Sequence, residues 1–245
     1  MSGTLWFLAA LLPFLWVQRW LHRQIQILLL LITHNPQWVV IIFSLVFLPG
    51  VFIHEGSHFL AARVLGVRVG GFSLVPRLLP KGQLQLGAVS TEKVDFFRDA
   101  VIGAAPLLAG GAIVALIAML PLKMTPVAAG IYAGDWQSVA AELRELPAIP
   151  DFWLWIYLAF TISSTMMPSA SDRRAWLPLI FLVAVLVCAA VLAGAGEWLM
   201  MHVAPVLDRA LYSAGLVFFL GIAIHLALGV PLSLLALLVG GFSRT

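Results

Sequence analysis

Two histidines and a glutamate lie together where the letters HEGSH occupy residues 54–58. On a helix, side chains four residues apart share a face, so His54 and His58 can bind one zinc ion. The intervening Glu55 is then placed to take a proton from a water on the metal, as a catalytic base. The motif ends an apolar run, and ionisable groups in a membrane segment are costly and usually functional. A polar pair hydrogen-bonded inside a helix bundle is the alternative.

Composition indicates a membrane protein, because 62% of the 245 residues are hydrophobic and only 10% are charged. Soluble domains carry about 25% charged residues. The net charge of +3 is small, and no basic patch is interleaved with aromatic residues, which excludes nucleic acid as the partner. Cys188 is the only cysteine, so neither a disulfide within the chain nor a multi-thiolate zinc site can form.

The hydrophobic pattern predicts an all-α polytopic fold, one integral membrane domain over residues 1–245 with about six transmembrane helices. Residues 3–33 form either one tilted span or an interfacial helix. The other expected helices lie at about 36–66, 98–121, 151–168, 175–194 and 207–240, the last with a surface helix around 198–201 before it. We expect the catalytic core in 36–66, 98–121 and 151–174. Residues 122–150 are predicted to form an extracytoplasmic loop with a short amphipathic helix at 135–146.

A small membrane-associated β-hairpin is predicted in residues 67–97, where the helical pattern breaks. Leu84 and Leu86 alternate with glutamines, the period-two pattern of a half-buried strand. Turn residues occupy 80–82. An open sheet edge cannot face lipid, so the edge must be buried in protein, line a cavity or meet a substrate.

The charge distribution predicts the orientation in a cell membrane. Basic residues concentrate in 63–98 and at 173–174, whereas 122–150 has few. The positive-inside rule therefore places the first two segments in the cytoplasm and the third outside. Helices two and four then end at the same cytoplasmic face, which also places the HEGSH motif there.

This topology brings Asp172, the carboxylate at the end of helix four, to the face that holds His54 and His58. Two histidines and one carboxylate with an open position are typical of a catalytic zinc site. The alternatives for Asp172 are capping the next helix or pairing with Arg173 or Arg174.

Residues 45–176 resemble the site-2-protease-type intramembrane zinc metalloproteases. The family's HExxH matches His54, Glu55 and His58, and the aspartate of its N-x-x-P-x-x-P-L-D-G motif matches Asp172. The segment 102–106 is similar to the Gly/Ala-Pro stretch that opens the family's next core helix. No PDZ or CBS module fits, so the chain resembles a minimal, divergent member.

Several positions of the second motif depart from the family pattern. Ser164 stands for the family's asparagine, Met167 and Ala170 for its prolines, and Ser171 and Arg173 for the Leu and Gly beside the aspartate. Ser164 or Thr165 is therefore expected to supply a hydroxyl where the asparagine would orient the substrate.

The resemblance implies a hydrolase that cleaves peptide bonds in or near transmembrane segments, with Zn2+ as its cofactor. Its partners would be the lipid bilayer and a membrane-protein substrate, expected to be a single-pass helix. Such a helix must unwind before attack, because its carbonyls are hydrogen-bonded. The sheet edge with Leu84 and Leu86 could pair with the unwound strand.

Other functions stay open. A zinc transporter is the strongest rival, although zinc importers resemble HExxHE and here Phe59 follows His58. A different membrane zincin would use Glu92 or Glu197 as its third ligand. A catalytically silent binding protein is a third possibility, against which the intact Glu55 argues. His225, inside the last helix, is expected to form an interhelical hydrogen bond.

Overall fold

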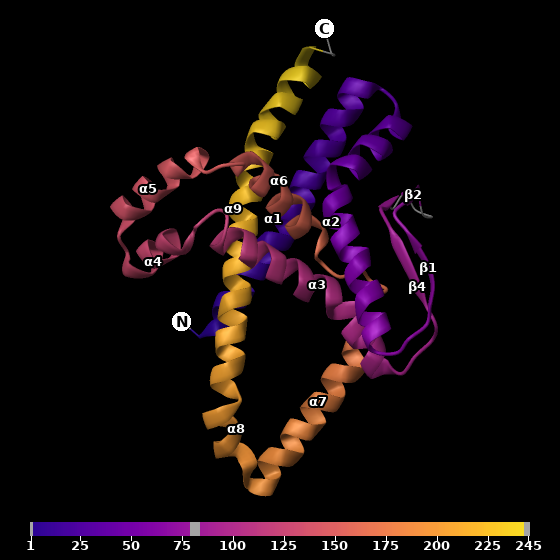
Figure 1. The fold of residues 1–245 in the computed structure, drawn as a ribbon, viewed down its shortest axis with the longest axis vertical. Coiled ribbons are helices and arrows are strands. Elements are labelled where there is room, and N and C mark those ends of the chain that lie inside the picture. The colour runs from indigo at the N-terminus through magenta and orange to yellow at the C-terminus, as the bar shows by residue number, and fades with distance from the viewer. Residues whose placement is uncertain (1, 79–83, 243–245) are drawn as a thin grey trace.

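The computed structural model describes residues 2–78 and 84–242 and has the predicted all-α membrane architecture with a small antiparallel sheet (Figure 1). Within these residues five helices are long and apolar enough to cross a membrane, or six if a bent pair counts as one span. The helices are α1 (Gly3–Thr33), α2 (Pro36–Val64), α3 (Phe96–Met119), α4 (Thr125–Ala133), α5 (Trp136–Glu145), α6 (Phe152–Thr165), α7 (Trp176–Ala190), α8 (Gly196–His202) and α9 (Ala204–Phe242).

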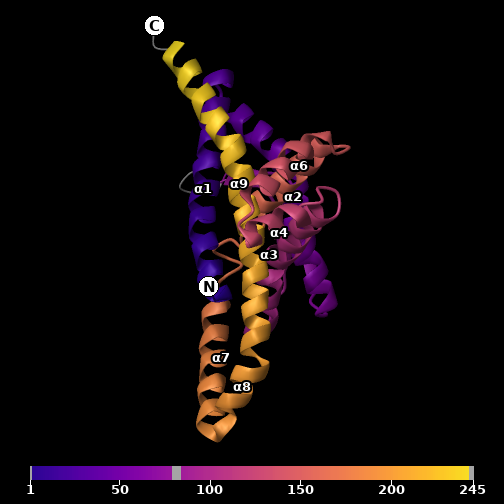
Figure 2. The same ribbon diagram turned by 90° about the vertical axis from the view of Figure 1, so that its left-hand side faces the viewer.

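Residues 3–33 form the single helix α1, which lies beside α9 along its length (Figure 2). Residues later in α1 contact residues later in α9, so the two helices run in the same direction. Small residues let membrane helices approach closely, and here aromatic side chains of α1 cover glycines of α9. The pairs are Trp6 on Gly215, Phe14 on Gly221 and Trp20 on Gly229.

The half of α2 that carries residues 54–58 is positioned by α3 and α6. Asn35 caps α2 through the Gln37 amide at 2.8 Å, as the Asn-Pro sequence predicts. Further along, Gly50 has no room for a Cβ because the Thr161 carbonyl of α6 lies against it. The main hydrophobic core fills the space between these helices with buried side chains such as Phe47, Val114 and Phe160.

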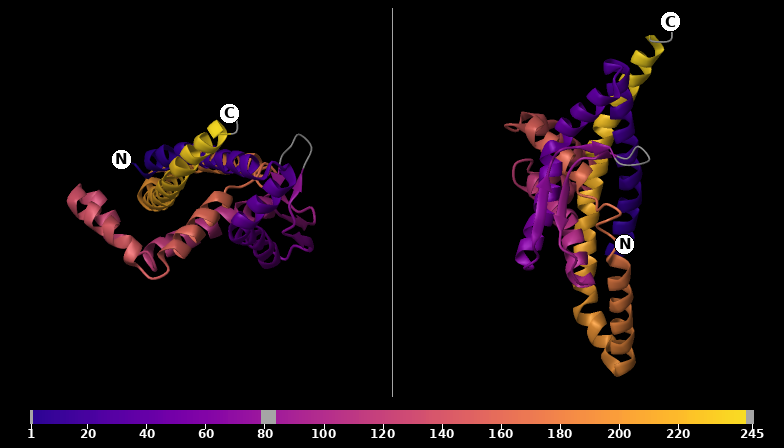
Figure 3. Two further views of the ribbon diagram at one scale, coloured as in Figure 1. Left: turned by 90° about the horizontal axis from the view of Figure 1, so that it is seen from above. Right: turned by 90° about the vertical axis from the view of Figure 1, so that its right-hand side faces the viewer.

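The predicted hairpin is present as two nested antiparallel pairs. β1 (Val69–Ser73) pairs with β4 (Ala88–Thr91), and inside them β2 (Arg77–Leu78) pairs with β3 (Leu84–Gln85). Both outer strands contact α2, and the hairpin lies beside that helix (Figure 3). Leu84 and Leu86 pack against the main core, which confirms that this side of the strand is half-buried. The predicted turn at 80–82 lies largely in 79–83, outside the described residues.

Helix four ends earlier than predicted. α6 stops at Thr165, rather than at 168 or 174, and residues 166–175 form an irregular loop with turns. Pro168 explains the early end, because a proline disfavours helical backbone at the residue before it and cannot continue the hydrogen-bond ladder. The loop that carries Asp172 is therefore not helical.

The predicted extracytoplasmic loop contains more helix than expected. Its amphipathic helix is α5, but α4 precedes it and a short 3-10 helix (Leu146–Ala148) follows it. Residues 198–201, where a surface helix was expected, lie in α8, which instead belongs to the candidate membrane span Trp176–His202. The helix is interrupted before α8 at Gly194, whose φ is 88°. α7 and α8 leave the bundle as two arms of a V (Figure 1), with no buried residue in α7.

Candidate metal centre

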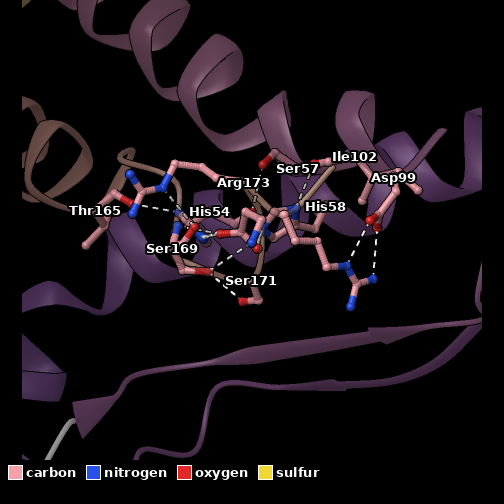
Figure 4. Close-up of polar contacts among 11 residues, drawn as sticks. His54, Ser57, His58, Asp99, Ile102, Thr165, Ser169, Ser171 and Arg173 are labelled. Atoms are coloured by element: carbon pink, nitrogen blue, oxygen red, sulfur yellow. Dashed lines mark hydrogen bonds and ion pairs between the residues drawn. The ribbon is translucent and has the colours of Figure 1, made fainter. Parts of the chain in front are cut away.

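The three predicted ligands His54, His58 and Asp172 meet at the C-terminal part of α2, and Figure 4 shows the two histidines there. The Nε2 atom of His54 lies 3.8 Å from one carboxylate oxygen of Asp172, and the Nε2 atom of His58 lies 3.5 Å from the other. The three ligand atoms all lie within 4.8 Å of one another, so this group could hold a metal ion.

The spacing can be compared with that of a zinc site. With metal–ligand bonds of about 2.0–2.1 Å, a tetrahedral zinc site places its ligand atoms roughly 3.3 Å apart. The nitrogen–oxygen distances of 3.8 and 3.5 Å, which go to different oxygens of Asp172, are somewhat longer than that value, and the ligand atoms taken one from each residue lie within 4.8 Å. Two imidazoles and one carboxylate are also a donor set that leaves a fourth position for a water or substrate.

Backbone carbonyls fix the two imidazoles in the orientation that metal binding needs. The Nδ1 atom of His54 lies 2.6 Å from the Thr165 carbonyl, and that of His58 lies 2.9 Å from the Ile102 carbonyl. A carbonyl can only accept, so both Nδ1 atoms must carry the proton. Each Nε2 atom then presents its lone pair to the ligand group, which is the usual arrangement of metal-binding histidines.

Both carbonyls are available because each lacks its helical donor. In a continuous helix the Ile102 carbonyl would accept from the N–H of residue 106, but that residue is proline and has none. The Thr165 carbonyl is the last of α6, where no further helical N–H follows. Proline and a helix end therefore supply the acceptors that orient His54 and His58.

Asp172 is held from its own loop and from α3. The Ser169 amide donates to its carboxylate at 2.7 Å. The backbone carbonyl of Asp172 packs so closely on Gly103 of α3 that no Cβ could be accommodated at residue 103. Burial raises the pKa of Asp172, but the adjacent imidazoles of His54 and His58 and the hydrogen bond from Ser169 outweigh it and hold that pKa well below its usual range. The carboxylate is therefore ionised at neutral pH, as metal binding requires.

The alternative roles considered for Asp172 do not occur. Arg174 instead makes a two-pronged ion pair with Asp99, at 2.8 and 3.0 Å. Arg173 donates from Nε to the Ser169 carbonyl at 3.2 Å. α7 begins without a side-chain cap, so Asp172 does not cap it. The arginines thus fasten the loop while the carboxylate faces the histidines.

Glu55 lies between the two histidine positions and is only 7% exposed. The hairpin covers it, because Gly87 packs directly on its side chain. A Cβ on Gly87 would lie 2.7 Å from the Glu55 Cγ and 3.0 Å from Oε1. The hairpin can approach Glu55 this closely because residue 87 has no side chain.

One cavity of about 670 Å³ joins every residue that the sequence predicted for the site. These are His54, Glu55, His58, Leu84, Leu86, Ser164, Thr165 and Asp172. The hydroxyls expected to meet substrate already have partners within the protein. Ser164 bonds the Nε2 atom of His225 at 2.8 Å, and Thr165 donates to carbonyls of its own helix.

That contact confirms the interhelical hydrogen bond expected of His225, which also bonds the Gly221 carbonyl at 2.7 Å. Of the rival third ligands, Glu92 pairs with Arg68 on the exposed side of the hairpin at 3.8 Å. Within the described residues neither Glu92 nor Glu197 belongs to a group that could hold a metal.

Sequence reasoning missed the orienting carbonyls, the Ser169 amide, and two residues of α1 that line the cavity, His22 and Gln26. The proline at residue 106 was the one sequence feature that could have indicated a free carbonyl at Ile102.

Comparisons with protein-family models, curated proteins and solved structures give no match for this chain. The family resemblance therefore depends on the motif residues themselves.

Proposed function

We propose that this protein is an intramembrane zinc metalloendopeptidase of the site-2-protease type. It hydrolyses peptide bonds in or near transmembrane segments of membrane-protein substrates. The observation that supports this function best is the convergence of a three-ligand group and a buried carboxylate, Glu55, on one cavity beside a membrane helix. A polar pair that merely joined helices would require neither the open ligand position nor the adjacent base.

The chemistry of the side chains suggests a separate role for each residue of the site. His54, His58 and Asp172 would hold the zinc, which would supply activation of a water and polarisation of the scissile carbonyl. Glu55 takes the proton of the attacking water and delivers it to the nitrogen of the leaving amine. Because the hairpin covers Glu55, bulk water is kept from its side chain and the proton transfer is confined to the cavity.

The hairpin also suits an unwound substrate. Residues 84–89 line the cavity opposite the metal ligands, so an extended segment can lie between them. Backbone pairing with the hairpin replaces the hydrogen bonds that the substrate helix loses on unwinding. Leu84 and Leu86 supply an apolar contact for its side chains. We place the site near the cytoplasmic face of the cell membrane, because the basic segments flank it.

The test compares wild-type protein with the Glu55→Gln variant in detergent or proteoliposomes, with zinc content measured by mass spectrometry. We expect Glu55→Gln to retain zinc and to lose roughly 100- to 10,000-fold in cleavage of a single-pass membrane substrate. Glu92→Gln, which alters an exposed carboxylate away from the cavity, is the matched control and should cleave normally.

Full activity of Glu55→Gln would end the assignment of the general base. Uptake of zinc into proteoliposomes by wild-type protein, without cleavage, would indicate a transporter instead. Loss of zinc in Glu92→Gln with retention in Asp172→Asn would favour a different membrane zincin.

A further inference from the structure

His22 is a half-buried polar residue that the proposed chemistry does not use. It lies on α1, with its ring edge-on to Phe43 at 5.5 Å and Phe47 at 4.9 Å between centroids. Its Nε2 atom is buried and has no hydrogen-bond partner among the described residues. A buried polar atom left without a partner costs stability, and polar groups inside a membrane usually serve a function. A ligand in the cavity would supply the partner.

The same cavity that contains the metal ligands is lined by His22 and by Gln26, one helical turn further along α1. Beside His22 the lining includes the apolar residue Phe43 of α2. The two ends of the cavity thus differ in chemistry. One holds the ligand group and Glu55, and the other presents the half-buried imidazole of His22 beside Phe43 and the carboxamide of Gln26, which is an exposed residue.

The helix geometry gives the spacing between these ends. His22 packs beside Phe43 and Phe47, which precede His54 on α2 by two to three helical turns. At 1.5 Å per residue this separation is roughly 10–16 Å. An extended peptide advances about 3.3 Å per residue. A substrate strand with its scissile bond at the ligand group would therefore place a side chain beside His22 about three to five residues away.

We propose that His22 and Gln26 form a side-chain subsite for an uncharged hydrogen-bonding residue of the substrate, an amide or a hydroxyl. This inference rests on the proposed function, because it requires an extended peptide in the cavity. An imidazole and a carboxamide can each donate and accept, which suits an amide or hydroxyl in either orientation. An ionised side chain would leave water beside Phe43 and Phe47 with no opposite charge lining this end.

The subsite gives the protease a basis for choosing among apolar membrane segments. A polar residue in a transmembrane helix has few partners in lipid, so its transfer to His22 and Gln26 favours the unwound, bound state. A segment without such a residue leaves the Nε2 atom of His22 buried and unpaired. The difference corresponds to one hydrogen bond, which changes affinity roughly three- to tenfold.

Binding measurements on the Glu55→Gln protein test the subsite, because this variant is expected to bind substrates without cleaving them. The probes are fluorescent single-span peptides rich in Leu and Ala, with one Gln placed successively along the segment, in detergent micelles. We expect Gln at one or two positions to bind about fivefold tighter than the all-apolar peptide. The added His22→Leu substitution should abolish this preference, and His22→Gln should restore part of it.

Two matched controls isolate the effect. The first control, Gln24→Leu, changes a residue of α1 that does not line the cavity. The second, His202→Leu, changes an exposed histidine of α8. Both should keep the preference that Gln26→Leu weakens. Equal binding of Gln-containing and apolar peptides, or a preference that survives His22→Leu, would overturn the subsite while leaving the protease assignment intact. Failure of every peptide to bind the zinc-loaded protein would overturn both.

Discussion

Gly103→Ala tests whether α3 sets the position of the third ligand. A Cβ at this residue would lie 2.9 Å from the carbonyl carbon of Asp172, where ordinary contacts begin at 3.4 Å, and closer still to its oxygen. The interior is close-packed, so the loop must retreat by about 1 Å. Zinc sites tolerate ligand displacements of about 0.2 Å. We therefore expect zinc affinity to fall about 10- to 100-fold, or roughly 1.4–2.8 kcal/mol.

The assay is competition for zinc against a chelator of known affinity, with helicity followed by circular dichroism. Alanine is a better helix former than glycine, so α3 itself should persist. Gly111→Ala on the same helix is the matched control, because its Cβ would meet nothing within 4 Å. Wild-type zinc affinity in Gly103→Ala would refute the view that contact with α3 fixes Asp172.

Three further outcomes follow from the same geometry. Gly87→Ala should displace the hairpin from Glu55 and reduce cleavage at least tenfold with zinc content unchanged. Pro106→Ala restores a helical donor that competes with His58 for its carbonyl, so zinc affinity should fall several-fold by chelator competition. Zinc measured across a pH series should be released as the ligating imidazoles protonate. Burial raises the pKa of Asp172, but the adjacent imidazoles and the Ser169 hydrogen bond depress it further, so this carboxylate stays ionised until the pH falls below its ordinary value near 3.8. Retention of zinc below pH 4 would contradict histidine ligation.

The ligand group could be predicted because its signals are local or follow from topology. His54, Glu55 and His58 lie on two turns of one helix, where the spacing alone fixes a common face. Asp172 was reached through the charge pattern, which assigns helix ends to membrane faces without any knowledge of packing. The half-buried strand at Leu84 was also predicted from a local pattern, the alternation of leucine and glutamine, but Gln85 is half-buried as well as Leu84, so the two sides of this short strand do not differ in exposure.

The remaining geometry depends on backbone groups, which carry no side-chain signal. Nothing in the residue type of Thr165 indicates that its carbonyl will accept from His54. The helix α4 was missed because its apolar pattern is short and lies in a segment that charge assigned to a loop. The residue type of Ser164 also did not indicate its partner. Its hydroxyl was expected to meet substrate, but it forms a hydrogen bond with His225 of α9.

Broken helices explain how polar chemistry can be assembled inside an apolar bundle. A continuous membrane helix uses its carbonyls for its own hydrogen bonds. Next to the histidines of α2, two carbonyls lack that helical donor: the Ile102 carbonyl, whose donor would be Pro106, and the Thr165 carbonyl at the end of α6. Each accepts from the Nδ1–H of one histidine, so both carbonyls remain hydrogen-bonded. A proline and a helix end thus fix the two imidazole tautomers, which is the arrangement a metal site requires.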